Sequence, residues 1–149
     1  MSILVTNDDG YSEGLRMLFE IAKSLDKDAY AVIPDRQKSA VSVALTLHKV
    51  LRLHEIKNNI STLSGTPADC VLFSIYSKQF KKPKLVLSGI NYGDNTSTGA
   101  LLSSGTIGAC WEAALEGVPA IAFSVYKTNH DWRRKSNCST QNFRHLHHP

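Results

Sequence analysis

Two aspartates stand where the first apolar segment of the chain ends, and their type and spacing could hold a metal ion. Asp8 and Asp9 belong to the motif NDDG, which follows the apolar run Ser2–Thr6. Adjacent carboxylates repel one another, and burying both without a partner is costly. A divalent cation such as Mg²⁺ or Mn²⁺ removes that cost, because it prefers oxygen ligands. The alternative is a capped turn before a helix, since Asn, Asp and Gly are common turn residues.

Two further polar clusters could take part in the same chemistry. Asn91 and Asn95 come after the apolar run Leu85–Leu87, where an amide carbonyl could complete a metal site without adding charge. The sequence Ser104-Gly105-Thr106 precedes a helical pattern. Backbone N–H groups and two hydroxyls at a helix start form an anion pocket, although simple N-capping is the commoner use of Ser and Thr there. The clusters together predict a metal ion beside a phosphate.

Strands and helices alternate along the chain and must bring these clusters together. The predicted strands are Ser2–Thr6, Ala29–Ile33, Leu85–Leu87 and Pro119–Ser124. The predicted helices are Glu13–Leu25, Pro67–Tyr76 and Ile107–Glu116, and a strand or hairpin outside the main sheet is expected over Leu47–Ile56. This alternation predicts a three-layer α/β fold, Rossmann-like with a mostly parallel sheet. Ligands of such sheets bind at the carboxyl ends of the strands, where Asp8 and Asn91 fall.

The composition is that of one ordinary globular domain. The chain has 149 residues, of which 42% are hydrophobic and 20% charged. No apolar run approaches the roughly 18 residues that span a bilayer, and the N-terminal sequence lacks a signal-peptide pattern, so we expect a cytoplasmic protein that does not contact a membrane. Three cysteines at wide spacing indicate reduced thiols, two of them in the core, rather than a disulfide framework or a metal site: Cys70, Cys110 and Cys138.

The last part of the chain differs in character from the rest. We expect an α/β domain over residues 1–126 and a polar, basic, poorly ordered tail over residues 127–149. Three histidines of this tail could bind metal adventitiously: His145, His147 and His148. The net charge is +4, but no stripe of Lys and Arg with interleaved aromatic residues is present. The charge therefore suits a small anionic substrate and does not indicate a dedicated nucleic-acid module.

Five segments, in order and with matching spacing, resemble the SurE family of survival proteins. They are ILVTNDDG (3–10), PDRQKSAVSVALTL (34–47), SGTPADCV (64–71), LSGINYGDN (87–95) and SSGTIGACWEAALEGVPAIAFS (103–124). Members of this family are nucleotidases that remove phosphate from nucleoside monophosphates. The resemblance therefore implies a metal-dependent phosphatase that hydrolyses nucleoside 5′- and 3′-monophosphates to nucleoside and phosphate.

The resemblance also implies which residues form the site. One divalent ion, Mg²⁺ or Mn²⁺, would be held by Asp8, Asp9, Ser39 and Asn91. The phosphate would face Asn95, Ser104, Gly105 and Thr106. Asp8 and Asp9 would be the catalytic residues, with in-line attack by a water molecule favoured over covalent attack by an aspartate.

The expected partners and the competing interpretations follow from the same comparison. A nucleoside monophosphate is the expected substrate, short polyphosphate a further one, and the longer family members imply a homo-oligomer, a dimer or a tetramer. We expect this chain to be C-terminally truncated, so an inactive nucleotide- or phosphate-binding remnant is the alternative. A dinucleotide-binding oxidoreductase is disfavoured, because NDDG stands where a glycine-rich GxGxxG turn would be needed.

Overall fold

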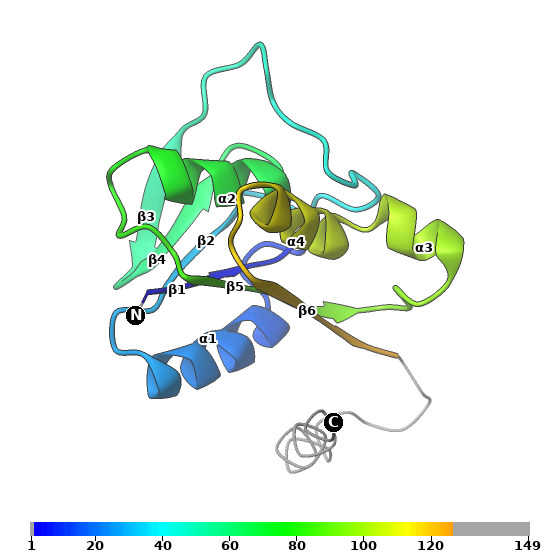
Figure 1. Cartoon of the computed structure of the whole chain (residues 1–149), viewed down its shortest axis with the longest axis horizontal. Helices are drawn as coiled ribbons and strands as arrows, with labels where there is room; N and C mark the ends of the chain where they lie inside the picture. Colours follow the sequence, from blue (N-terminus) through cyan, green and yellow to red (C-terminus); the bar gives the residue numbers. More distant parts are fainter. Residues whose placement is uncertain (1, 127–149) are drawn as a thin grey trace.

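The computed structural model describes residues 2–126, and its six-stranded sheet has the order β3-β4-β2-β1-β5-β6 (Figure 1). The strands are β1 (Ile3–Thr6), β2 (Tyr30–Pro34), β3 (Leu53–Lys57), β4 (Ile60–Leu63), β5 (Leu85–Tyr92) and β6 (Ala120–Val125). The helices are α1 (Glu13–Leu25), α2 (Pro67–Tyr76), α3 (Thr98–Ser103) and α4 (Gly105–Leu115). Only the β3–β4 pair is antiparallel within this sheet. The predicted mostly parallel α/β fold is confirmed.

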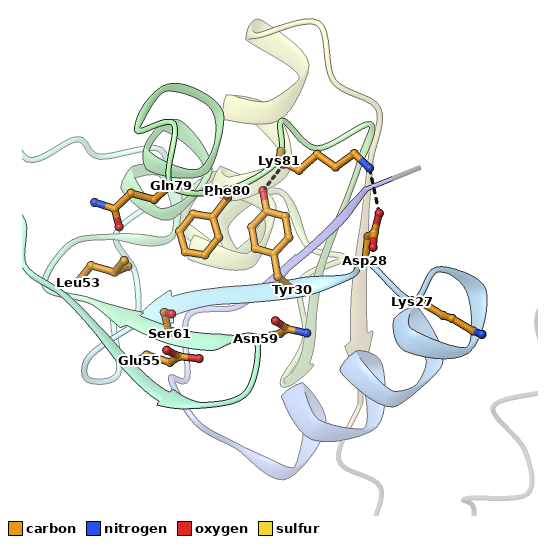
Figure 2. Close-up of a pocket in the computed structure, with 10 residues that line it drawn as sticks. All are labelled: Lys27, Asp28, Tyr30, Leu53, Glu55, Asn59, Ser61, Gln79, Phe80 and Lys81. Atoms are coloured by element: carbon orange, nitrogen blue, oxygen red, sulfur yellow. Dashed lines mark hydrogen bonds and ion pairs between the residues drawn. The ribbon is translucent and has the colours of Figure 1, made fainter.

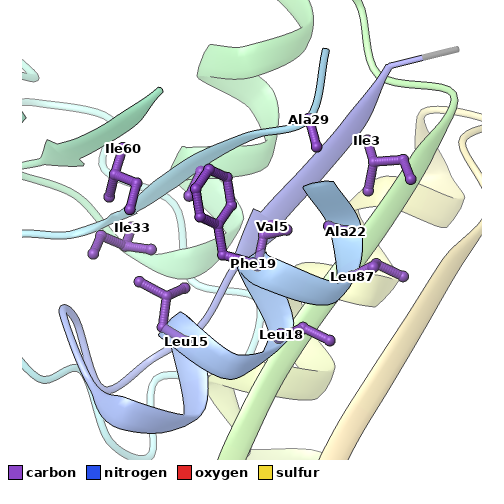
Figure 3. Packing of buried hydrophobic residues seen from close by; sticks show 11 residues of the cluster. Ile3, Val5, Leu15, Leu18, Phe19, Ala22, Ala29, Ile33, Ile60 and Leu87 are labelled. Carbon is purple, nitrogen blue, oxygen red and sulfur yellow. The ribbon is translucent and has the colours of Figure 1, made fainter. Parts of the chain in front are cut away.

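Helices cover both faces of the sheet, which gives the three layers. Successive side chains of a strand point to opposite faces, so Leu4 and Val5 of β1 enter different cores. On one face α1 packs its buried stripe, which includes Leu15, Leu18 and Phe19, against the sheet (Figure 3). On the other face α2 and α4 lie together over the sheet (Figure 1). The predicted tail, residues 127–149, lies outside the described residues, as does Cys138.

The hairpin β3–β4 belongs to the main sheet, so the predicted position outside it for Leu47–Ile56 is wrong. Strand β4 pairs in parallel with β2, and β3 then forms the antiparallel edge. Ile60 and Leu63 of β4 are buried, at 5% and 0% exposure. The turn between the two strands places Asn59 at φ 64, a left-handed conformation that Asn tolerates. A four-residue strand directly after such a turn leaves too short a pattern to recognise in the sequence.

Strand β5 continues five residues beyond its predicted end at Leu87. The segment from Ser88 to Tyr92 was expected to form a loop, but it pairs with β6 through Asn91 and Tyr92 after an irregularity. Gly89 permits this, because a Cβ there would lie 2.4 Å from the carbonyl oxygen of Phe123 and its φ is +136°. Asn91 is therefore held by a strand. Helix α3 was not predicted either, and it has only six residues.

The order of the strands reverses next to β1, and this marks one end of the sheet. From β1 the chain passes through α1 to β2 on one side, whereas β5 and β6 lie on the other side of β1. The strand order therefore reverses between β1 and β5. In open parallel sheets, ligands bind at such a reversal, outside the carboxyl ends of the strands. The residues that follow β1 and those that end β5 therefore lie where a ligand is expected to bind.

Candidate metal and phosphate site

The turn after β1 is closed by Asn7 and Ser12, which leaves both aspartates free for other contacts. The Asn7 amide donates to the Gly10 carbonyl oxygen (2.7 Å) and to Ser12 Oγ (3.2 Å), and Asn7 Oδ1 accepts from the Gly10 N–H (3.1 Å). Gly10 has φ +73°, and a Cβ there would lie 3.3 Å from the Pro34 carbonyl oxygen. The capped turn expected as the alternative to a metal site does form, but neither aspartate side chain closes it.

Asp8 is a buried carboxylate fixed to the start of α4. It is 7% exposed, and its Oδ1 accepts a hydrogen bond from Thr106 Oγ1 at 2.7 Å. The backbone N–H of Thr106, in the first turn of the helix, also favours the charged carboxylate. Burial nevertheless dominates and raises the pKa of Asp8. Close packing accompanies the contact, because a Cβ on Gly105 would lie 2.9 Å from Asp8 Cβ.

Asp9 is more exposed than Asp8 and faces the residues that follow β2. Its Oδ1 accepts a long hydrogen bond from Gln37 Nε2, at 3.4 Å. Burial raises the pKa of Asp9, and the neighbouring charge of Asp8 raises it further. Within residues 2–126 neither carboxylate forms an ion pair with Lys or Arg. Two neighbouring carboxylates that burial and mutual repulsion disfavour, without a basic partner in this part of the chain, make an environment that a divalent cation would stabilise.

The other predicted ligands approach the aspartates from two neighbouring segments. The Lys38 N–H donates to the Asp8 carbonyl oxygen at 2.7 Å, which places the exposed Ser39 next to the aspartate turn. Asn91 lies three residues after Ser88, which pairs with Thr6 of β1. Burial raises the pKa of the hydroxyl of Tyr92, the residue after Asn91, and the charges of Glu13 and Asp9 raise it further. The end of β5 therefore lies near the aspartates.

The four predicted phosphate residues have contacts that the sequence did not reveal. The Thr106 hydroxyl is fully buried on Asp8, and Gly105 is packed against the same aspartate. Ser104 caps α4, since its Oγ accepts from the Ile107 N–H at 3.2 Å. Asn95 donates to Ser124 Oγ at 2.7 Å. Phosphate contacts of these residues stay predictions, and the support that Thr106 gives to Asp8 is an additional role.

Other features of the described residues do not compete with this site. Residues 2–126 contain no group of three or more His, Cys, Asp and Glu able to hold a metal ion. Cys70 is buried and Cys110 half-buried, and both are free thiols. No helix in this part of the chain is long and apolar enough to cross a membrane.

A hollow of about 540 Å³ lies at the opposite edge of the sheet, near the amino ends of β2 and β4 (Figure 2). Some of its polar groups are paired with one another: Lys81 and Asp28 form an ion pair at 2.9 Å, and the Tyr30 hydroxyl donates to the Lys81 carbonyl oxygen at 3.1 Å. The Tyr30 ring also stacks on Phe80, with centroids 4.7 Å apart. This hollow offers no adjacent pair of carboxylates like Asp8 and Asp9, so we place the chemistry at the carboxyl ends of β1 and β5.

The fold and the site together define an open, mostly parallel α/β domain with an acidic centre where the strand order reverses. A sequence model of the family described as "Survival protein SurE" matches residues 3–148. A solved structure, the SurE protein from Aquifex aeolicus, is similar with a TM-score of 0.79 and 34% identity, over 97% of this chain and 61% of that chain. The chain belongs to the SurE family, as its sequence motifs predicted.

Curated relatives support the same assignment. They carry the name 5′-nucleotidase SurE, and two of them show the extent of the match. The relative from Pyrobaculum arsenaticum is 47% identical over 137 residues, which cover 89% of this chain and 50% of the relative. The relative from Geotalea uraniireducens is 48% identical over 130 residues, covering 87% and 52%. The chain therefore spans about half the length of the curated relatives it matches.

Proposed function

We propose that this chain carries the metal and catalytic centre of a phosphatase that hydrolyses nucleoside 5′- and 3′-monophosphates to nucleoside and phosphate. The observation that carries the proposal is the pair Asp8–Asp9 at the carboxyl end of β1, with Asp8 fixed to the α4 N-terminus by the Thr106 hydroxyl. The relatives named 5′-nucleotidase support the substrate class. Short polyphosphate is a second substrate worth testing, because it offers the same anionic phosphoryl group.

Oxygen donors of the right kind for Mg²⁺ or Mn²⁺ are available at this centre. Asp8 and Asp9 would hold the ion together with the Ser39 hydroxyl and the Asn91 amide oxygen. Burial raises the pKa of both carboxyl groups, and the charge of Asp8 raises that of Asp9 further, so a cation beside the pair would be favoured. A bound divalent cation supplies charge neutralisation, polarises a phosphoryl oxygen and lowers the pKa of a water molecule.

The two aspartates have different tasks in this proposal. Asp8 is buried and held by Thr106, so it serves as a fixed ligand. Asp9 is more accessible than Asp8, so a water molecule reaches its carboxylate more readily. Asp9 therefore orients the attacking water and accepts its proton, while Asn95 and the α4 N-terminus face the phosphate. Covalent attack by an aspartate is the alternative, and a trapped phosphoenzyme in a single-turnover reaction would favour it.

A binding module without turnover is the second candidate function. The chain spans about half of its curated relatives, and the outer strand β6 exposes apolar side chains, with Ile121 at 46% and Val125 at 41% exposure. Exposed apolar surface of this kind marks places where other structure packs.

The assembly into a dimer or tetramer and the cytoplasmic location stay predictions.

Phosphate release from a panel of nucleoside monophosphates, with added Mn²⁺ or with EDTA, tests the proposal. We expect release only with metal, and a loss of about 100-fold or more in Asp9→Asn, because a general base contributes 10²–10⁴ in rate. Asp28→Asn is the matched control, since Asp28 lies at the opposite edge of the sheet and should leave turnover unchanged. Turnover in EDTA would contradict the proposal, whereas nucleotide binding without turnover would favour the binding module.

A further inference from the structure

The segment between β2 and β3 carries Gln37, Lys38 and Ser39, yet residues 35–52 contain neither a helix nor a strand. Loops of this length without regular structure are uncommon in compact domains and are usually functional. Such a segment can hold a ligand in place only if other elements fix it. The contacts that do so therefore decide where Ser39 stands.

A buried carboxylate at the start of α2 holds the middle of this segment. Asp69 is 4% exposed, and its oxygens accept hydrogen bonds from the Thr46 N–H (2.9 Å), the Thr46 hydroxyl (2.6 Å) and the Thr66 N–H (2.8 Å). The Thr66 hydroxyl in turn donates to the Ala44 carbonyl oxygen at 2.6 Å. The capping box of α2 is thus also a clasp for residues 44–46.

Two hydrogen bonds and one close packing contact fix the part of the segment that lies between this clasp and the aspartates. The Ser42 N–H donates to the Ser103 carbonyl oxygen at 2.9 Å, and Gly108 of α4 approaches the Ser42 backbone so closely that a Cβ would lie 2.0 Å from its oxygen. The Lys38 N–H donates to Asp8 at 2.7 Å. Ala40 and Ser42 have φ values of 56° and 52°, a left-handed conformation that persists only when the surrounding structure enforces it.

We infer that Asp69 is a positioning residue, whose carboxylate fastens the 35–52 segment to α2 through Thr46 and so keeps Ser39 and Gln37 beside Asp8 and Asp9. This inference rests on the proposed function for the importance of Ser39, whereas the clasp itself rests on the hydrogen bonds that the two threonines donate to Asp69. Asp69 acts through Thr46 and does not touch the substrate. Its charge matters because a carboxylate can accept all three hydrogen bonds, whereas an amide oxygen cannot accept from every donor.

Thr46→Val tests the clasp without disturbing the α2 cap, because it removes one hydroxyl, keeps the side-chain shape and leaves Thr66–Asp69 intact. We expect cleavage within residues 35–52 by a dilute protease to speed up about tenfold, and the Mn²⁺ concentration at half-saturation to rise about tenfold, the effect of one lost hydrogen bond to a charged group. The far-UV circular dichroism spectrum of the folded protein should change little, because the α2 cap is intact. Thr46→Ser keeps the hydroxyl and should behave as the natural protein does.

Several outcomes would overturn the inference. If Thr46→Val is cleaved at the same rate as the natural protein and is saturated at the same Mn²⁺ concentration, the clasp does not exist. Equal losses in Thr46→Val and Thr46→Ser would show that the hydroxyl is not the basis of the clasp. Asp69→Asn, which also weakens the α2 cap, should show the same losses to a larger extent. If the natural chain binds no Mn²⁺ and releases no phosphate, the proposed function fails, and the protease comparison still decides whether the clasp exists.

Discussion

Asp8 depends on a side chain that is 98 positions away in the sequence. The Thr106 hydroxyl donates to the Asp8 carboxylate inside the protein. If this donor is lost there, water cannot take its place as readily as it does at the surface. The motif NDDG and its place after an apolar strand were enough to identify the pair as a candidate metal site. The partner on α4 was not recoverable from the sequence, because Ser104-Gly105-Thr106 has the ordinary pattern of a helix start.

Thr106→Val should therefore destabilise the protein. We expect the free energy of unfolding, measured without added metal, to fall by about 1.5–3 kcal/mol, because the variant leaves a buried carboxylate without its hydroxyl donor. Urea unfolding in EDTA measures this. Thr106→Ser retains the hydroxyl and should lose much less. A Thr106→Val variant as stable as the natural protein, beside a destabilised Thr106→Ser, would mean that the threonine methyl group, and not the hydrogen bond, supports the site.

At the level of elements, the contact between α4 and the 35–52 segment requires a glycine. A Cβ on Gly108 would lie 2.0 Å from the Ser42 carbonyl oxygen, so the helix or the segment must move. Gly108→Ala should lower the free energy of unfolding by about 1–3 kcal/mol, the usual cost of overpacking. Gly99→Ala on α3 is the control, because nothing lies within 4 Å of the added carbon and the change should be neutral or stabilising. If Gly99→Ala destabilises the protein while Gly108→Ala leaves its free energy of unfolding unchanged, the close contact at Gly108 does not require a glycine.

The elements differed in how far the sequence predicted them. Helix α2 begins at Pro67 as expected, because Thr66 and Asp69 form a capping box with a proline in the first turn. Strands β1 and β2 were predicted from continuous apolar runs, because strands that are buried on both faces have nearly continuous hydrophobic sequences. The continuation of β5 through Asn91 was missed, because its polar residues resemble a loop until the pairing with β6 is known. Pairing with a distant strand overrides local composition.

Across the whole molecule, stability should depend on pH through a buried acid remote from the proposed site. Glu112 on α4 is 5% exposed, and burial, Glu116 and Asp69 raise its pKa above the ordinary value of 4.5. A folded-state pKa above the unfolded value gives stability that is present below the unfolded pKa and lost as the pH rises through the folded one. Glu112 therefore lowers stability at neutral pH.

Glu112→Gln should raise the free energy of unfolding at pH 7 and flatten its decline between mildly acidic and neutral pH. The substitution removes the charge and nearly preserves the shape of the side chain. Urea unfolding curves at several pH values give the comparison, with the exposed Glu20→Gln on α1 as the control. A glutamine variant that is less stable than the natural protein at pH 7 would show that the charged form of Glu112 is stabilising.

The proposed function of the molecule requires that Asp8 and Asp9 bind a divalent ion. Calorimetric titration with Mn²⁺ tests this binding most directly. We predict about one ion per chain in the natural protein, with the main heat absent from the double variant Asp8→Asn/Asp9→Asn, since that variant keeps the fold but lacks the two charged ligands. Heat that remains in the variant belongs to other groups of the chain. A natural protein that takes up no Mn²⁺, or a double variant that binds it equally well, would contradict the central claim.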